Sequence, residues 1–595
     1  MLYSFYKSDY TERRYIMSDN RVSIASTMFK RSGAWFGLFQ QGVDFGLTNL
    51  YLGSLHGMAA RAPEKTKMIN IYPTFDGKKI PFTIEAVPAE LTIVTNHGNV
   101  RFTFADKTKL VAQGDPGMGL LFEKTMVQHE TVHPRKNGAW EAFFRLTSAF
   151  IFMPTKGSAF DFNKGEKYWN WETLSSDKVR GRTYPAPDGT FELVMEEFPY
   201  GGIIRDSYPS YEEARASMQA EWDEFYGKMP KFIEPLEKGR LNAEYTLWTY
   251  LTSPYGYAKH TMIQMFAGVM ASQWQMCQNA VALQEDLDTA IDLLLGPLAR
   301  ASEEGQLSDS YDDSAYESIM IKPPVHGWAL KQIMKHHDLA KEVPTETLEY
   351  MYKGIGKWGD WFMNYRDDYG KGMPMLYHGD ETGLDDTTMF LNHGQLYTPD
   401  ICSYLVILFE AVGDLGKILS KPEDEVNAWY AKSKKLLDLM IETFWDGERF
   451  VARVPATNEP VISGSLVHYI PAILGNRLPK EIIDKLTDDL LNPETFNSPY
   501  GLASEDMTSD YFYPDGMSIG RGVTVPPAAL YICTGLWETH RKEDARELAF
   551  RYCKGVMDAG FPFLVNPLNG RGAGGYYGGS WPRCAFVILA RMLSE

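Results

Sequence analysis

The chain has 595 residues, of which 44% are hydrophobic and 13% aromatic, and its formal net charge is −18. This length exceeds that of one ordinary domain, and the composition supports large cores and excludes intrinsic disorder. The negative charge repels nucleic acid and anionic membranes, and no stripe of lysine and arginine offsets it.

The five cysteines are dispersed without a CxxC pair, at Cys277, Cys402, Cys533, Cys553 and Cys584. An odd, scattered set is typical of reduced thiols and not of a disulfide framework. The first residues lack the apolar core of a signal peptide, and no run of about 18 apolar residues occurs. We therefore expect a cytoplasmic protein that has no membrane partner.

Residues 1–207 have the pattern of β-structure. The stretch IPFTIEAVPAELTIVTNHGNVRFTFAD (80–106) alternates apolar and polar positions and is rich in Val, Ile, Thr and Phe. Several such runs without a helical pattern between them predict an antiparallel β-sandwich domain over 1–207. The next segment changes to a helical period, so we expect a linker helix within 208–240.

Helical segments joined by short turns occupy residues 241–595. The expected spans are 241–253, 275–285, 287–304, 325–338, 344–366, 398–419, 423–445, 464–473, 480–491, 523–537, 540–559 and 579–594. Such a succession of hairpins fits six helical pairs closed into a ring, and the chain is mainly α with an N-terminal β domain. An open solenoid is less favoured because no sequence period of about 30–45 residues is present.

Three loops between these helices are rich in polar residues, at 373–400, 498–522 and 562–582. The strings QWQMCQNAVAL, IKPPVHGWAL, HGDETGLDD, LLNPETFNSPYGL, IGRGVTVPPAALYI and NPLNGRGAGG follow one another over residues 260–594. Together they resemble the (α/α)6 glycoside hydrolases of families 63 and 37 and the related mannosylglycerate and glucosylglycerate hydrolases. The resemblance implies an (α/α)6 toroid preceded by a β-sandwich, and a glycosidase that acts on a small carbohydrate or glycoside.

The family loop Glu-Ser-Gly-Met/Leu-Asp carries the general acid, and here it reads ETGLD over 381–385. The resemblance therefore implies that Asp385 is the proton donor, which a glycosidic oxygen needs before it can leave. Asp380 and Glu381 are expected to contact substrate. Crowding among these acids and Asp386 would keep one carboxyl protonated near neutral pH.

Four positions depart from the family pattern. The family's catalytic base falls on Phe563, its Trp-Asp pair reads Trp274-Gln275, and its glutamine before the Pro-Pro pair is Lys322. Arg521 is retained, but the aromatic residues around it are not. Each of these three replacements shifts the charge of the funnel in the positive direction, so an anion becomes a candidate ligand. The alternative is a site that no longer works, in which Lys322 pairs with Asp385 or Glu381.

Three explanations for the missing base stay open. The base has moved to Glu505, Asp506 or Asp510, since inverting enzymes need two carboxyl groups roughly 6.5–9.5 Å apart. Alternatively, phosphate replaces water as the nucleophile in an inverting phosphorylase, held by Lys322, Arg521, Arg571 and the glycine-rich segment 570–579. The third explanation is that an anionic substrate supplies its own carboxylate.

Other residues complete the predicted site. His378 is a candidate sugar contact or proton relay, and Tyr577, Trp274, Gln275 and Phe563 are expected to line the substrate site. The histidines show no metal-ligand spacing and no βαβ unit precedes the glycine-rich segment, so we expect neither a metal nor a cofactor. The rival functional class is a sugar-binding regulator, lyase or isomerase on the same fold.

Overall fold

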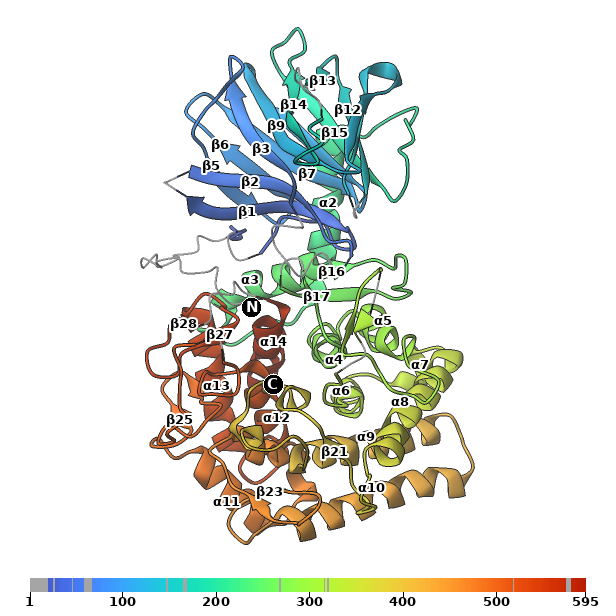
Figure 1. Ribbon diagram of the computed structural model, residues 1–595, viewed down its shortest axis with the longest axis vertical. Coiled ribbons are helices and arrows are strands. Elements are labelled where there is room, and N and C mark those ends of the chain that lie inside the picture. The colour runs from blue at the N-terminus through green and yellow to red at the C-terminus, as the bar shows by residue number, and fades with distance from the viewer. Residues whose placement is uncertain are drawn as a thin grey trace.

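The computed structural model describes residues 20–595 apart from 25–26, 45–46, 58–66, 146–147, 164–168, 267–268, 315, 318–319, 517 and 574–578. Figure 1 shows a β-structured N-terminal part stacked on a ring of helices. The predicted fold class, an antiparallel β domain followed by a helical toroid, is confirmed.

Two antiparallel sheets form the N-terminal part. The first has the strand order β1-β2-β3-β9-β14-β13, with β4 paired to β3, and the second has the order β10-β11-β12-β15-β8-β7-β6-β5. The strands are β1 (Phe36–Asp44), β2 (Leu47–Ser54), β3 (Lys67–Phe75), β4 (Lys78–Lys79), β5 (Thr83–Val87), β6 (Glu90–Val94), β7 (Asn99–Asp106), β8 (Lys109–Gly114), β9 (Met118–Val127), β10 (Thr131–Pro134), β11 (Trp140–Phe143), β12 (Ala149–Thr155), β13 (Ala159–Asn163), β14 (Ser175–Tyr184) and β15 (Phe191–Phe198). On β6 the alternate residues Leu91 and Ile93 are fully buried, as the predicted period of two requires.

Helix α2 (Tyr211–Lys228) connects the sandwich to the toroid. Its first turn is capped reciprocally by Ser210 and Glu213, because each side chain accepts a hydrogen bond from the other residue's backbone N–H. The buried face carries Met218 against β7 and Trp222, whose ring lies 5.5 Å from that of Trp248 on α3.

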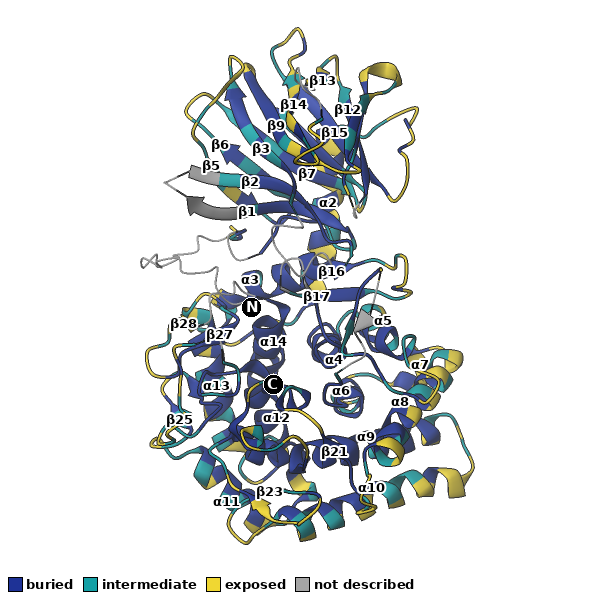
Figure 2. Cartoon of the chain, viewed as in Figure 1, coloured by how far each residue is buried: buried dark blue, intermediate teal, exposed yellow. Residues whose placement is uncertain are grey.

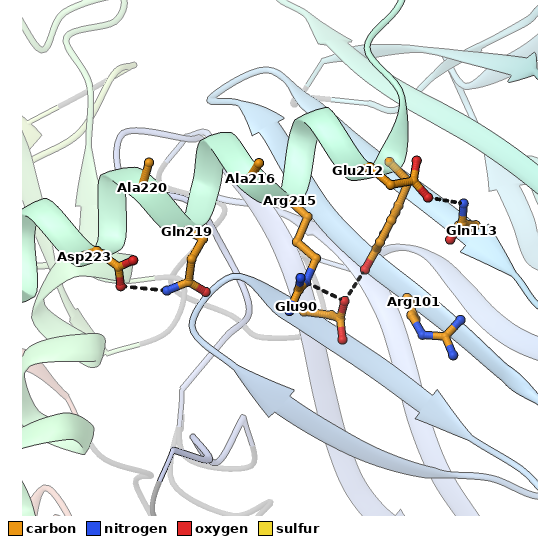
Figure 3. A pocket seen from close by; sticks show the side chains of 10 residues that line it. Glu90, Arg101, Gln113, Glu212, Arg215, Ala216, Gln219, Ala220 and Asp223 are labelled. Carbon is orange, nitrogen blue, oxygen red and sulfur yellow. Dashed lines mark hydrogen bonds and ion pairs between the residues drawn. The ribbon is translucent and has the colours of Figure 1, made fainter.

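A groove of about 550 Å³ separates the exposed side of α2 from the second sheet (Figure 3). Its charged groups are paired within the protein. Arg215 Nε and the Tyr211 hydroxyl lie 2.9 and 2.7 Å from Glu90 Oε2, and Arg101 pairs with Asp115 at 2.7 Å.

Figure 1 shows the ring-like arrangement of the helices. Within the part of the chain that the structure describes, six inner helical segments contact one another in a closed ring. They are α4 (Gln273–Ala282), α6 (His326–Ile333), α9 (Pro399–Ile418), the 3-10 segment η5 (Leu466–Arg477), α12 (Pro526–Leu536) and α14 (Ser580–Ser594). Each contacts the next in this order, and α14 contacts α4.

Six outer helices cover this ring. They are α5 (Leu287–Leu298) on α4, α8 (Thr345–Tyr365) and α10 (Glu423–Phe444) on α9, α11 (Lys480–Leu490) on η5, α13 (Lys542–Asp558) on α12, and α3 (Glu237–Tyr250) on α14. The short helix α7 (Leu339–Glu342) precedes α8. Figure 2 shows the inner helices buried, while outer helices such as α10 alternate between buried and exposed faces. Because inner and outer helices alternate along the chain, the inner helices all begin at the same end of the ring, and the loops before them meet there.

Candidate functional site

Asp385 and Lys322 form an ion pair at the end of the ring where the inner helices begin. Lys322 Nζ lies 3.0 Å from Asp385 Oδ1 and donates to the Asp380 carbonyl oxygen at 2.6 Å. Burial lowers the pKa of Lys322, but the negative charges of Asp385 and Asp309 outweigh burial and raise it. The predicted proton donor is therefore next to a protonated lysine.

The backbone around Asp385 is held by a close contact with α4. Gly383 has φ of 80°, and a Cβ atom added there would lie 2.3 Å from the indole ring of Trp274. Only glycine satisfies both conditions. The contact between Gly383 and Trp274 therefore fixes the distance of the Asp385 loop from the first turn of α4.

Glu381 anchors the same loop to the end of α8 through an ion pair with Arg366. Arg366, at the end of α8, makes a bidentate pair with it, with Nη1–Oε2 and Nη2–Oε1 distances of 3.0 and 2.9 Å. The Tyr377 amide donates to Glu381 Oε2 at 2.7 Å, and the guanidinium of Arg366 lies 3.9 Å from the Tyr377 ring centroid. Glu381 and Arg366 are both buried, so the structure places this carboxylate in a supporting ion pair.

Asp386 joins the Asp385 loop to the loop 498–522. Its carboxylate accepts hydrogen bonds from the Ser518 hydroxyl and, at 3.2 Å, from the Gly520 amide, which also lies 3.0 Å from the Asp385 carbonyl oxygen. Burial raises the pKa of Asp386, and these hydrogen bonds oppose the shift. A Cβ atom on Gly520 would lie 2.6 Å from Thr387 N, so the two loops are in direct backbone contact.

The predicted base candidates lie on the second loop. Glu505 is fully buried and accepts hydrogen bonds at 2.7 Å from the Thr388 and Ser509 hydroxyls. Burial raises the pKa of Glu505, although those hydrogen bonds lower it. Asp506 accepts from the amide and hydroxyl of Thr508 in a local turn, and Asp510 is exposed. Only Glu505 is linked to the Asp385 loop, through Thr388.

Arg521 directly follows Gly520 and is half-buried. Its Nε donates to the Tyr511 carbonyl oxygen at 3.2 Å, and its guanidinium lies 5.4 Å from the Tyr511 ring centroid. Within the described part of the chain, no carboxylate lies within ion-pair distance of this guanidinium. Tyr511 and Tyr513 are exposed beside it.

Aromatic residues fill the floor of the ring. The Phe563 ring lies 5.1 Å from that of Trp581, which is 5.7 Å from that of Trp274. Trp581 Nε1 donates to Gln278 Oε1 at 2.8 Å. Gln275 Oε1 accepts from the Ser272 amide at 3.2 Å. The positions that depart from the family pattern, Phe563 and Gln275, are thus buried in a packed apolar floor.

The remaining predicted contacts have mixed outcomes. His378 is exposed, and its Nδ1 accepts from the Asp380 amide at 3.2 Å. Arg571 is exposed at the start of the glycine-rich segment. Tyr577, Gly574 and Gly575 lie outside the described residues.

Besides Arg366, sequence reasoning did not single out Gln273 or Asp400. Gln273 Nε2 donates to the carbonyl oxygen of Lys322 at 3.0 Å, and its amide donates to the Asp309 carbonyl oxygen at 2.7 Å. Asp400, at the start of α9, is fully buried, and burial raises its pKa to about 6. Gln273 begins the matched string QWQMCQNAVAL, so its position at a helix start was the available signal.

Across the described ranges, no group of three or more histidine, cysteine, aspartate or glutamate side chains could hold a metal ion. The helices within those ranges are also too short or too polar to cross a bilayer.

Comparison with known proteins gives a family match and remote structural neighbours. The model of the mannosylglycerate hydrolase MGH1-like glycoside hydrolase domain matches residues 234–579, more than half of the chain. The family 63 mannosylglycerate hydrolase from Thermus thermophilus in complex with glucose is 15% identical, with a TM-score of 0.49 over 57% of this chain and 97% of that one. The same enzyme with Tris and D-glycerate is 16% identical, with a TM-score of 0.48 over 60% of this chain and 100% of that one.

The neutral trehalase from Saccharomyces cerevisiae is 15% identical, with a TM-score of 0.44 over 54% of this chain and 72% of that one. No curated protein matches the chain.

Proposed function

The chain belongs to the mannosylglycerate hydrolase MGH1-like glycoside hydrolase family, and we propose that it cleaves the glycosidic bond of a small glycoside with Asp385 as the proton donor. The observation that carries this proposal is the exposure of the acids in one loop. Asp385 keeps 41% of its side chain exposed, whereas Glu381 keeps 4% and is bound to Arg366. Asp385 is therefore free to meet a glycosidic oxygen, and Glu381 serves to hold the loop.

Lys322 has a role in the proposed step. When Asp385 gives its proton to the leaving oxygen it becomes a carboxylate, and an ammonium at 3.0 Å stabilises that product. Burial lowers the pKa of Lys322 and the charges of Asp385 and Asp309 raise it, so the ammonium is most stable once Asp385 has become a carboxylate. Lys322, which replaces the glutamine of the family pattern, thus acts directly on the proposed acid Asp385.

The nucleophile has two candidate sources. Glu505 is one, because Thr388 links it to the Asp385 loop, although substrate binding has to expose the buried carboxylate before it can activate water. Phosphate or a substrate carboxylate is the other. It is favoured by the guanidinium of Arg521 beside Gly520, which lies within ion-pair distance of no carboxylate among the described residues, although its charge interacts with Asp386 and Glu505. Phosphate is itself a nucleophile and needs no protein base, which fits the apolar Phe563 at the family's base position.

The test is a screen of purified protein against neutral disaccharides, glycosyl glycerates and uronosides, each with and without inorganic phosphate. Free sugar as the product supports hydrolysis, and a sugar phosphate supports phosphorolysis. The Asp385→Asn variant is measured in parallel as the background. Turnover of no glycoside above that background in either condition would refute glycoside cleavage and favour a sugar-binding, lyase or isomerase role.

A further inference from the structure

His56 lies at the junction between the sandwich and the toroid. Its Nδ1 is 2.8 Å from Asp313 Oδ2 and its Nε2 is 3.3 Å from Glu197 Oε1. The ring also stacks on Trp35, with centroids 5.0 Å apart. Glu197 belongs to β15, whereas Asp313 belongs to the loop between α5 and α6. One buried imidazole therefore joins a carboxylate from each part of the molecule.

This imidazole is positively charged at neutral pH. Burial lowers the pKa of His56, but the charge of Glu197 and the hydrogen bonds to Asp313 and Glu197 outweigh it and raise the pKa to about 9. The other titratable groups described around this cluster are Lys30, whose charge interacts with Glu197, and Tyr255, whose ring lies 4.7 Å from that of His56.

Asp313 is fixed by further contacts. Its Oδ1 accepts from the Gly57 amide at 2.7 Å, and its carbonyl oxygen accepts from the Tyr257 amide at 2.8 Å. A Cβ atom on Gly256, whose φ is 54°, would lie 2.3 Å from that carbonyl oxygen. The loop 309–314 is thus clamped between the sandwich and the segment before α4.

The same loop continues to the proposed catalytic pair. The Gln273 amide at the start of α4 donates to the Asp309 carbonyl oxygen at 2.7 Å. The Gln273 side chain donates to the Lys322 carbonyl oxygen at 3.0 Å, and the Lys322 ammonium pairs with Asp385. A path therefore leads from His56 to Asp385 through contacts of hydrogen-bond length, which are joined by the backbone of 309–313 and by the residues Gln273 and Lys322 themselves.

We propose that His56 is a positioning residue for this site: as an imidazolium it holds the loop 309–314, and through Gln273 it sets the place of Lys322 beside Asp385. The catalytic role of the Lys322–Asp385 pair rests on the proposed function. The effect of His56 on the position of Lys322 does not rest on it. A residue of the β-sandwich thus controls the geometry of a site that the toroid builds.

The test is amide hydrogen exchange of the full-length protein at pH 7, read by mass spectrometry. His56→Gln removes the charge, and Asp313→Asn breaks only the toroid half of the junction. The control is His540→Gln, because His540 pairs with Asp484 at 2.5 Å within the toroid and away from the 309–314 loop. Peptides covering 309–314 and 272–276 should exchange about tenfold faster in the first two variants and unchanged in the control.

Two further readouts distinguish positioning from general stability. Acetic anhydride labelling of Lys322, followed by mass spectrometry, should increase in His56→Gln and Asp313→Asn and stay low in His540→Gln. In the parent, exchange of the same peptides, corrected for its intrinsic pH dependence, should rise as the pH passes about 9, where His56 loses its proton. His56→Gln should show no such step.

Unchanged exchange and labelling in both junction variants, or an equal response in His540→Gln, would overturn the inference. Should His56→Gln fail to fold, Asp313→Asn alone decides. Neither readout uses a substrate. Loss of protection without any glycoside turnover in the parent would refute the proposed function alone, and Asp385-dependent turnover with unaltered protection would refute the positioning alone.

Discussion

Lys322 Nζ lies 3.0 Å from Asp385 Oδ1 and 2.6 Å from the carbonyl oxygen of Asp380, so one ammonium contacts both the proposed acid and the backbone of its loop. Lys322 is thereby already paired. The sequence analysis predicted that Lys322 and Arg521 together hold an anion. Because Lys322 is paired with Asp385, Arg521 is the remaining candidate, and no carboxylate in the described chain lies within ion-pair distance of its guanidinium.

Asp385→Asn should lower kcat/KM by about 100- to 10,000-fold, because an amide keeps the shape of the side chain but cannot donate an acidic proton. The thermal midpoint should change little, since the side chain is 41% exposed. Asp510→Asn, on an exposed residue of the neighbouring loop, is the control. Activity of Asp385→Asn within tenfold of the parent would remove Asp385 from the acid role.

Lys322→Met and Arg521→Met should behave differently. Lys322 acts on Asp385, so its loss should lower kcat for neutral and anionic substrates alike. Loss of Arg521 should raise KM for phosphate or an anionic substrate about ten- to hundredfold and leave neutral sugars unaffected. Arg521→Lys should not restore binding, because a point charge does not replace a planar fork. Equal effects of Arg521→Met on neutral and anionic substrates would exclude an anion at Arg521.

Phe563→Glu should destabilise the protein and should not create efficient hydrolysis. The new carboxylate would be buried beside Trp581 without a partner, which costs several kcal/mol, roughly 2–5. Chemical denaturation measures that cost, and Phe563→Leu serves as the apolar control. A large gain in glucoside hydrolysis would show instead that this one position explains the departure from the family.

Breaking the pair between Arg366 and Glu381 should unfold the Asp385 loop or the whole protein. Removing one partner of a buried ion pair typically costs about 3–5 kcal/mol, and Arg366→Met leaves Glu381 buried and uncompensated. Lys434→Met, in the exposed pair with Asp438, should cost less than about 1 kcal/mol by the same urea titration. Similar costs for the two variants would contradict the anchoring role of Glu381.

Asp400→Asn should stabilise the protein above pH 6 but not near pH 4. Burial raises the pKa of Asp400 from 3.8 to about 6, so the folded state retains a proton that the unfolded state loses between these values. Ionisation in the folded state therefore costs up to about 3 kcal/mol at neutral pH, and an amide removes that cost. Thermal midpoints measured at both pH values test this, and an equal change at both would show that ionisation is not involved.

Local patterns predicted the regular helices closely. The expected span 398–419 corresponds to α9, Pro399–Ile418, because a helical apolar period follows a proline that is suited to a first turn. The span 464–473 was expected to be α-helical but forms η5, a 3-10 segment that contains Pro471 and reaches Arg477 through Gly475 at φ 54°. A proline cannot donate the backbone hydrogen bond that an α-helix needs there.

The site was predictable residue by residue but not as a set of contacts. The sequence left open whether Lys322 pairs with Asp385, with Glu381 or with a bound anion, and the fold brings it to ion-pair distance of Asp385, 63 positions away. Arg366 lies outside every matched string, so the buried partner of Glu381 was missed. The junction of His56 with Asp313, 257 positions apart, has no local sequence signal at all.

The closure of the inner ring by α14 has a consequence during synthesis. Until the ribosome has released these 15 residues, α3, α4 and α12 expose the apolar surfaces that α14 later covers. Trp581 and the wholly buried Arg583 belong to α14, so the aromatic contact between Trp581 and Trp274 also forms only after α14 has been made. The helical part therefore emerges as an open arc with exposed apolar surface, and the ring closes only when α14 packs between α12 and α4.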